Sequence, residues 1–241
     1  MKGVILAGGS GSRLYPLTKV TNKHLLPVYD KPMIYYPIEA MVRSGITDIM
    51  IVTGGNNAGD FLELLSNGKD FGLKKLHYTY QEGESGIAHA LYQAKHFVGK
   101  SKVMVILADN IFEATLERYV KKFSQIEEGA MVLLKESDKP QRFGVAVFEG
   151  KKLVKIEEKP AIPKSNYIVT GIYFYDNKVF DIIEKLKPSQ RGEYEITDVN
   201  NWYLEKGQLY YDFLEGFWTD AGTFESLFRA NCFIARKNNI E

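Results

Sequence analysis

The sequence predicts an α/β protein with a Rossmann-like, mostly parallel central sheet and helices on both faces of that sheet. Short apolar runs such as Val4–Ala7 are typical of strands that are buried on both faces. These runs alternate with segments of helical periodicity, which is the order of βαβ units. The 241 residues, 45% hydrophobic and 25% charged, have an ordinary globular composition.

The alternating elements fill the chain up to about residue 140. After Val4–Ala7, the predicted strands are Asp48–Gly55, Lys75–Gln81, Lys102–Asp109 and Ala130–Glu136. The predicted helices between them are Met33–Gly45, Asn57–Leu65, Gly86–Phe97 and Leu116–Glu128. Ligands of open α/β sheets bind at the carboxyl ends of strands, so we expect Gly8–Arg13, Gln81 and Asp109 on one rim.

From about Phe143 the chain becomes strand-rich. GVAVFEGKKLVKIEEKP, YIVTGIYFYD and QLYYDFLEG predict strands, the first with a hairpin turn at Glu149–Lys151. Helices are predicted over 177–186, 195–205 and 223–237. Since no low-complexity linker separates the halves, we expect a single domain over residues 1–241.

Charge and cysteine content exclude several classes of protein. Lys and Arg number 31 against 30 Asp and Glu, which argues against a nucleic-acid or membrane partner. The single cysteine, Cys232, excludes an internal disulfide and a multi-cysteine metal site. The first apolar run is too short for a signal peptide, and no segment approaches the length of a membrane span. We therefore expect a cytoplasmic protein.

A glycine-rich loop, Gly8–Ser12, follows the first predicted strand. Glycine lets backbone N–H groups approach a ligand closely, and phosphate is the usual guest of such loops. Neither the P-loop nor the dinucleotide fingerprint fits, because no lysine follows Gly11 and Leu14 stands at the third glycine. The alternative is an ordinary turn, but Arg13 and Lys23 favour polyphosphate.

Two acids and two cations elsewhere suit the same chemistry. Asp109 follows a buried strand and Asp220 lies in FWTDAGT, so the pair could hold Mg²⁺ together with phosphate oxygens. Their alternatives are a turn cap and a helix N-cap region. Lys159 in EEKP and Arg191 in RGEYEITD could hold a second phosphate-bearing substrate, or could be ordinary surface charges.

No motif for nucleophilic catalysis is present, and the four histidines have no metal-ligand spacing. Gln81 at a strand end and Gly86 at a helix start could recognise the edge of a nucleobase. Together these features indicate phosphoryl-type transfer, which depends on positioning and charge stabilisation.

The chain resembles the sugar-1-phosphate nucleotidyltransferases, and within them the group that uses dTTP and glucose 1-phosphate. The similarity spans nearly the whole chain through ten motifs in the family's order: GGSGSRLYPLT, NKHLLPV, KPMIYYP, QEGESGIAHA, LADNIF, RFGV, EEKP, VTGIYFYD, RGEYEITDVNNWY and WTDAGT. One such motif would be weak evidence for the family, whereas ten motifs in the same order are specific evidence for it.

The resemblance implies that a glucose 1-phosphate oxygen attacks the α-phosphorus of dTTP in line, giving dTDP-glucose and pyrophosphate, with Mg²⁺ as cofactor. The implied catalytic residues are Arg13, Lys23, Asp109 and Asp220, the two aspartates as metal ligands. The implied nucleotide-binding residues are Leu6, Gly8, Gly9, Ser10, Gly11, Ser12, Gln81, Gly86 and Asn110. The implied sugar-phosphate-binding residues are Gly144, Glu158, Lys159, Val169, Tyr173 and Arg191. Residues 1 to about 140 would then form a nucleotide-binding half, and residues from about 141 to 241 would form a sugar-phosphate-binding half. A homo-oligomeric state is one possibility that the sequence leaves open.

Five positions depart from the family's common pattern. Glu84 replaces the family's common proline, and His89 replaces a glutamine. Ala108 replaces a glycine, Phe143 replaces a tyrosine and Ala221 replaces a threonine. The alternatives are an enzyme that uses UTP or another sugar 1-phosphate, a non-catalytic nucleotide-sugar sensor and, more distantly, a dinucleotide-dependent reductase. The intact catalytic residues argue against the sensor.

Overall fold

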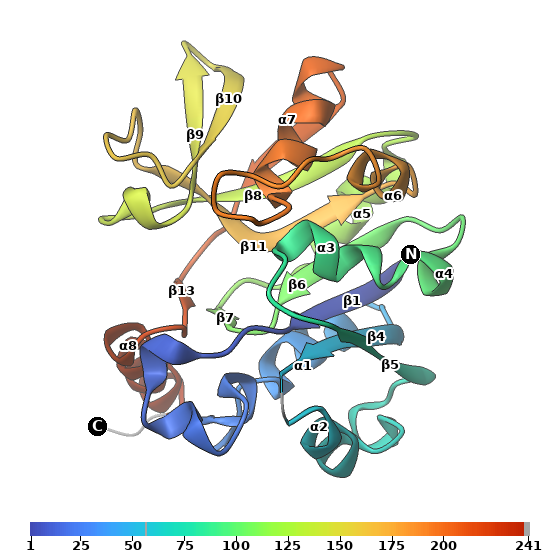
Figure 1. Cartoon of the computed structure of the whole chain (residues 1–241), viewed down its shortest axis with the longest axis vertical. Helices are drawn as coiled ribbons and strands as arrows, with labels where there is room; N and C mark the ends of the chain where they lie inside the picture. Colours follow the sequence, from blue (N-terminus) through green and yellow to red (C-terminus); the bar gives the residue numbers. More distant parts are fainter. Residues whose placement is uncertain (56, 239–241) are drawn as a thin grey trace.

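Nine strands form one sheet at the centre of the molecule, in a computed structural model that describes residues 1–55 and 57–238 (Figure 1). The strand order is β10-β9-β11-β6-β1-β4-β5, with β8 beside β11 and β12 beside β8. The strands are β1 (Lys2–Ala7), β4 (Asp48–Gly54), β5 (Lys75–Gln81), β6 (Val103–Leu107), β8 (Ala130–Glu136), β9 (Gly144–Glu149), β10 (Lys152–Glu158), β11 (Tyr167–Tyr175) and β12 (Leu209–Phe213).

The sheet is mixed, and its parallel part carries the glycine loop. Strands β5, β4, β1 and β6 are parallel to one another, which confirms the α/β class with its Rossmann-like core. Strand β11 runs antiparallel to β6, β8 and β9, so the strand-rich second half brings in the antiparallel pairs. Strand β10 also pairs antiparallel with β9, and this hairpin stands at the top of Figure 1.

Helices cover both faces of the sheet, as expected. The alternation within β1 shows why: Val4 and Leu6 belong to one core cluster, Ile5 and Ala7 to another. The first cluster packs against α3 (Ile87–Tyr92), α4 (Lys95–Val98), α6 (Val179–Ile183) and α7 (Ile196–Glu205). The second packs against α1 (Tyr35–Arg43), α2 (Ala58–Leu65) and α5 (Glu117–Gln125).

A third, smaller hydrophobic cluster is built around the C-terminal helix α8 (Phe224–Lys237). This helix lies beside the N-terminal loops in Figure 1. Strand β13 (Trp218–Asp220), which precedes α8, pairs with β7 (Asn110–Phe112), and β2 (Pro27–Val28) pairs with β3 (Lys31–Pro32). Three short 3-10 turns lie in the chain between β1 and β2. Asp220 is thereby brought level with Asn110, its partner in the β13–β7 register.

Several predicted boundaries are wrong for local reasons. The helix expected over Gly86–Phe97 is two helices, because the N–H groups of Gln93 and Ala94 donate to carbonyls three residues back. The strand expected to reach Asp109 ends at Leu107, since the chain turns there into β7. Among the described residues, no helix combines the length and apolar character needed to cross a membrane.

Candidate active site

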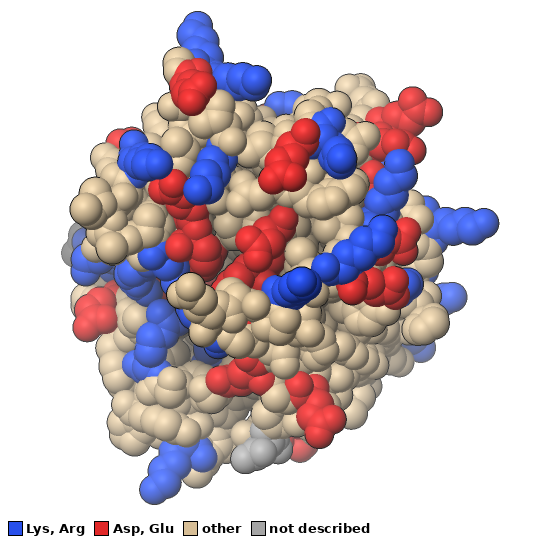
Figure 2. Space-filling model, turned by 45° about the horizontal axis from the view of Figure 1, so that its top comes forward, with Lys and Arg blue, Asp and Glu red and all other residues tan. Residues whose placement is uncertain are grey.

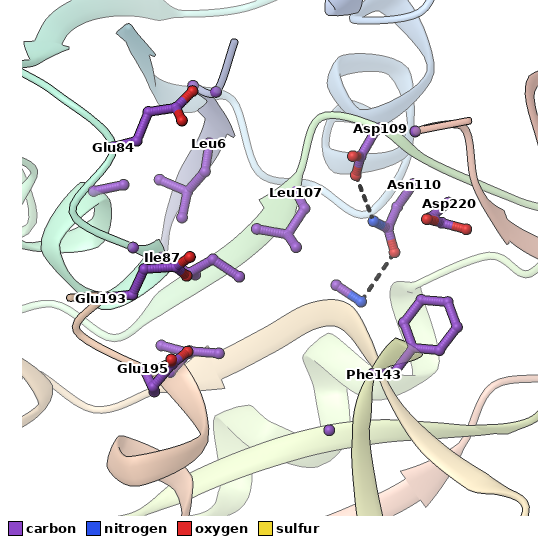
Figure 3. Close-up of a pocket in the computed structure, with 18 of the residues that line it drawn as sticks. Leu6, Glu84, Ile87, Leu107, Asp109, Asn110, Phe143, Glu193, Glu195 and Asp220 are labelled. Atoms are coloured by element: carbon purple, nitrogen blue, oxygen red, sulfur yellow. Dashed lines mark hydrogen bonds between the residues drawn. The ribbon is translucent and has the colours of Figure 1, made fainter. Parts of the chain in front are cut away.

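A cavity of about 500 Å³ opens where β1, β5 and β6 end, and it is lined by residues of both halves of the chain. All of the candidate site residues line it, from Leu6 and the glycine loop to Arg191 and Asp220. Figure 3 shows Asp109, Asn110 and Asp220 on one side of this cavity and Leu6, Glu84 and Ile87 on the other. The shared rim expected for Gly8–Arg13, Gln81 and Asp109 is confirmed.

The glycine loop is folded tightly over the chain that follows it. Gly9 and Gly11 have φ of 99° and 64°, in the region that favours glycine. A Cβ on Gly11 would lie 2.9 Å from Thr18 Cγ2 and 3.2 Å from Lys23 Cβ. The Thr18 hydroxyl donates to the Gly11 carbonyl at 2.7 Å. Gly11 and Lys23 are therefore in close contact, and a larger residue at position 11 would push Lys23 away from the glycine loop.

Lys23 and Asp109 form a largely buried ion pair, with Nζ and Oδ2 2.7 Å apart. Burial alone would raise the pKa of Asp109, but the nearby charge of Lys23 lowers it well below its usual value. Asn22 fixes the short turn at Lys23, because its side chain accepts from the His24 N–H at 3.0 Å. Burial and the neighbouring Lys23 lower the pKa of His24 to about 3, so His24 is neutral here.

Asp220 approaches Asp109 across Gly222. A Cβ on Gly222 would lie 3.5 Å from Asp220 Oδ2, 3.6 Å from Asp109 Oδ2 and 3.1 Å from Arg13 Nη2. Asp220 Oδ2 also pairs with Arg142 Nη2 at 2.9 Å. Burial, reinforced by the charge of Asp109, nevertheless raises the pKa of Asp220 to about 6. The absence of a side chain at 222 leaves room between the two carboxylates.

The capping alternative for Asp220 is wrong. Thr223 is the N-cap of α8, and it exchanges a capping box with Ser226: the Ser226 N–H donates to Thr223 Oγ1, and the Thr223 N–H donates to Ser226 Oγ. Asp220 lies three residues earlier, on β13, and is directed toward Arg142.

Asn110 joins Asp109 to two other strands. Its Nδ2 donates to Asp109 Oδ1 at 3.1 Å, and its Oδ1 accepts from the Gly171 N–H at 2.9 Å and from Trp218 Nε1 at 2.8 Å. Figure 3 shows the first of these bonds beside Asp220. A Cβ on Gly171 would overlap the side-chain amide of Asn110, so glycine is required there. Asn110 therefore lines the cavity as expected and also orients Asp109.

Lys159 and Arg191 flank one carboxylate at the far end of the cavity. Glu158 Oε1 lies 3.6 Å from Lys159 Nζ and 3.9 Å from Arg191 Nη1. Arg191 also pairs with Glu193 and Glu195. The two cations, although 32 positions apart by their numbers, thus face the same small volume.

The charges that line the cavity nearly cancel. The cations are Arg13, Lys23, Arg142, Lys159 and Arg191, and the anions are Glu84, Asp109, Glu158, Glu193, Glu195 and Asp220. With five of one sign and six of the other, the cavity is slightly negative. Figure 2 shows basic and acidic side chains interspersed on one face of the molecule as well.

Four charged residues of the cavity have no role among the sequence-based predictions: Glu84, Arg142, Glu193 and Glu195. The last two pair with Arg191. Arg142, in the motif RFGV, pairs with Asp220. Glu84, a departure from the family's pattern, accepts a hydrogen bond from the Ser10 N–H, a donor of the glycine loop. Neither contact has a signal in the sequence, because 78 and 74 positions separate the partners.

A glycine loop, two neighbouring carboxylates and clustered cations at the carboxyl edge of an α/β sheet are the arrangement expected of a nucleotidyltransferase. The chain belongs to the nucleotidyl transferase family, whose model matches residues 2–237. It is 46% identical over its full length to the glucose-1-phosphate thymidylyltransferase of Neisseria meningitidis, of which it covers 85%. It is 45% identical over 97% of its length to that of Mycolicibacterium smegmatis, of which it covers 82%.

Solved structures agree with this membership. A Bacillus anthracis protein, provisionally named a glucose-1-phosphate thymidylyltransferase and solved with sucrose, has a TM-score of 0.93 and 55% identity, with 97% of this chain and 94% of that one covered. A UDP-glucose pyrophosphorylase in complex with UDP-glucose has a TM-score of 0.85 at 24% identity and 98% coverage of both chains. The second likeness concerns the fold alone.

Proposed function

We propose that the chain transfers a thymidylyl group from dTTP to glucose 1-phosphate, giving dTDP-glucose and pyrophosphate. The observation that carries the proposal is that the glycine loop, the Asp109–Asp220 pair and the Lys159–Arg191 pair all line one cavity. The names of relatives 45–46% identical over nearly the whole chain support the choice of dTTP and glucose 1-phosphate. A non-catalytic sensor would have no need for the carboxylate pair.

The nucleotide lies along the first half of a single domain, residues 1 to about 140. Its base is held at the end formed by Leu6, Gln81 and Gly86, and Gln81 is buried there with an amide able to bind a base edge. Its phosphates lie over the N–H groups of the loop Gly8–Ser12. Arg13 holds the leaving pyrophosphate, since a guanidinium grips phosphate through two parallel N–H groups.

The sugar phosphate lies against the second half, residues from about 141 to 241. Lys159 and Arg191 bind its phosphate, which would take over part of their pairing with Glu158. Gly144, Glu158, Val169 and Tyr173 surround the sugar ring. The Glu158 carboxylate can accept from sugar hydroxyls, while the Thr197 hydroxyl donates to its other oxygen at 2.5 Å.

The site fits Mg²⁺. Two carboxylate oxygens face one gap at Gly222, and a slightly negative cavity needs added positive charge to hold two phosphate-bearing anions. Among the described residues no cluster of three or more His, Cys, Asp or Glu could hold an ion, so phosphate and water would complete the ligand set of Asp109 and Asp220. When bound, Mg²⁺ supplies charge neutralisation between the reacting phosphates.

The proposed reaction requires no general base from the protein. A sugar phosphate oxygen is already anionic near neutral pH and attacks the α-phosphorus directly. The low pKa of Asp109 keeps that carboxylate ionised. Lys23, 2.7 Å from Asp109, places its charge beside the α-phosphate as the bond to pyrophosphate breaks. Positioning and charge therefore carry the reaction.

Pyrophosphate release over a grid of substrates tests the proposal. The grid combines dTTP, UTP and ATP with glucose, galactose and mannose 1-phosphates in the presence of Mg²⁺, with Asp109→Asn as the inactive control. We expect the highest kcat/KM for dTTP with glucose 1-phosphate. A preference for UTP or for another sugar would replace the substrates named here, and no release in any combination would favour the sensor.

A further inference from the structure

The side-chain amide of Gln81 is oriented by two fixed acceptors. Gln81 is 5% exposed, and its Nε2 lies 3.2 Å from the Gly86 carbonyl oxygen and 3.1 Å from His89 Nδ1. A carbonyl oxygen only accepts, so the amino group rather than the amide oxygen must face Gly86. This contact settles the orientation of the amide.

His89 is in turn held as an acceptor. Its ring stacks on that of Tyr194, with centroids 5.9 Å apart and 27° between the planes. The amino group of Gln93 donates to the His89 carbonyl at 3.2 Å and lies 3.5 Å from His89 Nε2. Both ring nitrogens thus face amino groups, and a neutral imidazole accepts at only one of them. The shorter contact assigns acceptance to Nδ1 and the proton to Nε2.

This pairing leaves Gln81 with one group to offer a ligand. Its two amino hydrogens are directed to Gly86 and His89, so only Oε1 remains. Oε1 lies against the glycine loop, 3.3 Å from where a Cβ on Gly8 would be. Gly8 and Gln81 both line the cavity, at the end where Figure 3 shows Leu6 and Ile87.

We propose that His89 is a positioning residue that fixes Gln81 as a pure acceptor, so that the base site selects a pyrimidine with a ring N–H. Thymine and uracil carry a proton on N3, whereas cytosine has a lone pair there and would face Oε1 with a second acceptor. A site built to receive a hydrogen bond strongly rejects an analogue that lacks the donor. The inference rests on the proposed function and specifies which nucleotides it accepts.

Steady-state kinetics with dTTP and dCTP, at saturating glucose 1-phosphate, test the role of His89. Replacing His89 by leucine removes one neutral hydrogen bond to Gln81, and we expect the dTTP/dCTP ratio of kcat/KM to fall about three- to tenfold. The change should lie in the KM for dTTP, with kcat little altered. His89→Gln, which restores an acceptor, should keep the ratio within about twofold of the original.

His96→Leu makes the same substitution on the neighbouring helix α4, at an exposed side chain, and should leave the ratio unchanged. A purely structural role for His89 would lower kcat/KM for both nucleotides alike, and an unchanged ratio in His89→Leu would overturn the proposal. If no variant and no wild-type sample turned over dTTP, the proposed function itself would fail. The two failures are therefore distinguishable.

A measurement on the unaltered protein does not depend on any variant folding. In ¹⁵N-histidine NMR spectra at pH 8, we expect His89 as the tautomer with an unprotonated Nδ1 and a protonated Nε2. A protonated Nδ1 would face the Gln81 amino group as a second donor and could not hold it, which would overturn the proposal.

Discussion

At the scale of single residues, the pKa values of the two carboxylates of the site are shifted in opposite directions. Asp109 is stabilised as an anion by Lys23, whereas Asp220 is buried beside Asp109 and its pKa is raised to about 6. The cations Arg142, Arg13 and Lys23 act against this rise without cancelling it. Asp220 is thus costly to ionise in the absence of metal, which is the pattern of a residue kept for function rather than stability.

Asp220→Asn should therefore stabilise the metal-free protein while abolishing turnover. The folded-state pKa of Asp220 lies above its ordinary value of 3.8, so ionisation penalises the folded state. The penalty is absent below about pH 4, where the group is protonated in both states, and complete above about pH 6. We expect the variant to gain about 1–3 kcal/mol in unfolding free energy at pH 7.5 and to lose that gain toward pH 4.

Urea unfolding in EDTA, monitored by circular dichroism at both pH values, measures this difference. Pyrophosphate release with Mg²⁺ measures turnover, which should fall by orders of magnitude. A variant less stable than the original at pH 7.5 would mean that the Arg142 ion pair outweighs the cost of burial. Near-normal turnover would contradict the metal-ligand role of Asp220.

At the scale of elements, three strands meet at Asn110. Strand β7 begins with it, β11 provides the Gly171 N–H, and β13 provides Trp218. The register of β11 against β8 shifts between Val169 and Tyr173, at the point where Gly171 meets Asn110. This junction sets where Asp109 and Asp220 lie relative to each other.

Gly171→Ala should disturb the junction and the chemistry together. The new Cβ would overlap the side-chain amide of Asn110, which is buried with several partners that restrict its movement. Overpacking of this kind costs about 1–3 kcal/mol. We expect lower stability and a lower kcat, because Asp109 loses the bond that orients it.

Gly59→Ala on α2 is the matched control, since nothing lies within 4 Å of the added Cβ. It should leave kcat unchanged and raise stability by up to about 1 kcal/mol. Thermal unfolding and steady-state kinetics on both variants make the comparison. Equal behaviour of the two would show that the junction tolerates displacement of Asn110.

At the scale of the whole molecule, the cavity lies at one edge of a continuous sheet and is lined by residues from both halves of the chain. Strands β1 and β6 supply the glycine loop and Asp109, and β10 leads into Lys159 at the other end. The cavity has slightly more negative than positive side chains, so a triphosphate cannot enter it favourably without a counter-charge.

The stabilisation of the fold by dTTP should therefore depend on Mg²⁺. With Mg²⁺ and dTTP at about a hundred times Kd, binding adds about 2.7 kcal/mol, which raises Tm by about 5 °C or more in a chain of this size. With EDTA in place of Mg²⁺ the rise should largely disappear. Differential scanning fluorimetry, with Mg²⁺ alone as the control, measures both, and an equal rise in EDTA would contradict the charge argument.

The sequence alone determined the alternating elements and most of the candidate residues. Apolar runs such as Val4–Ala7 are local patterns, and the first residues after a strand in a parallel sheet share one edge by geometry. The glycine loop, Gln81 and Asp109 could therefore be placed together from local patterns and strand geometry. Their placement is confirmed, while their binding and catalytic roles stay predictions.

Only the tertiary structure decided how distant charges pair. Arg142 reaches Asp220 across 78 positions, the Gln81–His89 contact depends on a Tyr194 ring from the other half, and β7 pairs with β13 about a hundred residues away. Such contacts produce no periodic pattern in the sequence, because they result from the packing of whole helices and strands rather than from the order of residues along the chain. The raised pKa of Asp220 has the same origin, since burial and the approach of Asp109 exist only in the folded chain.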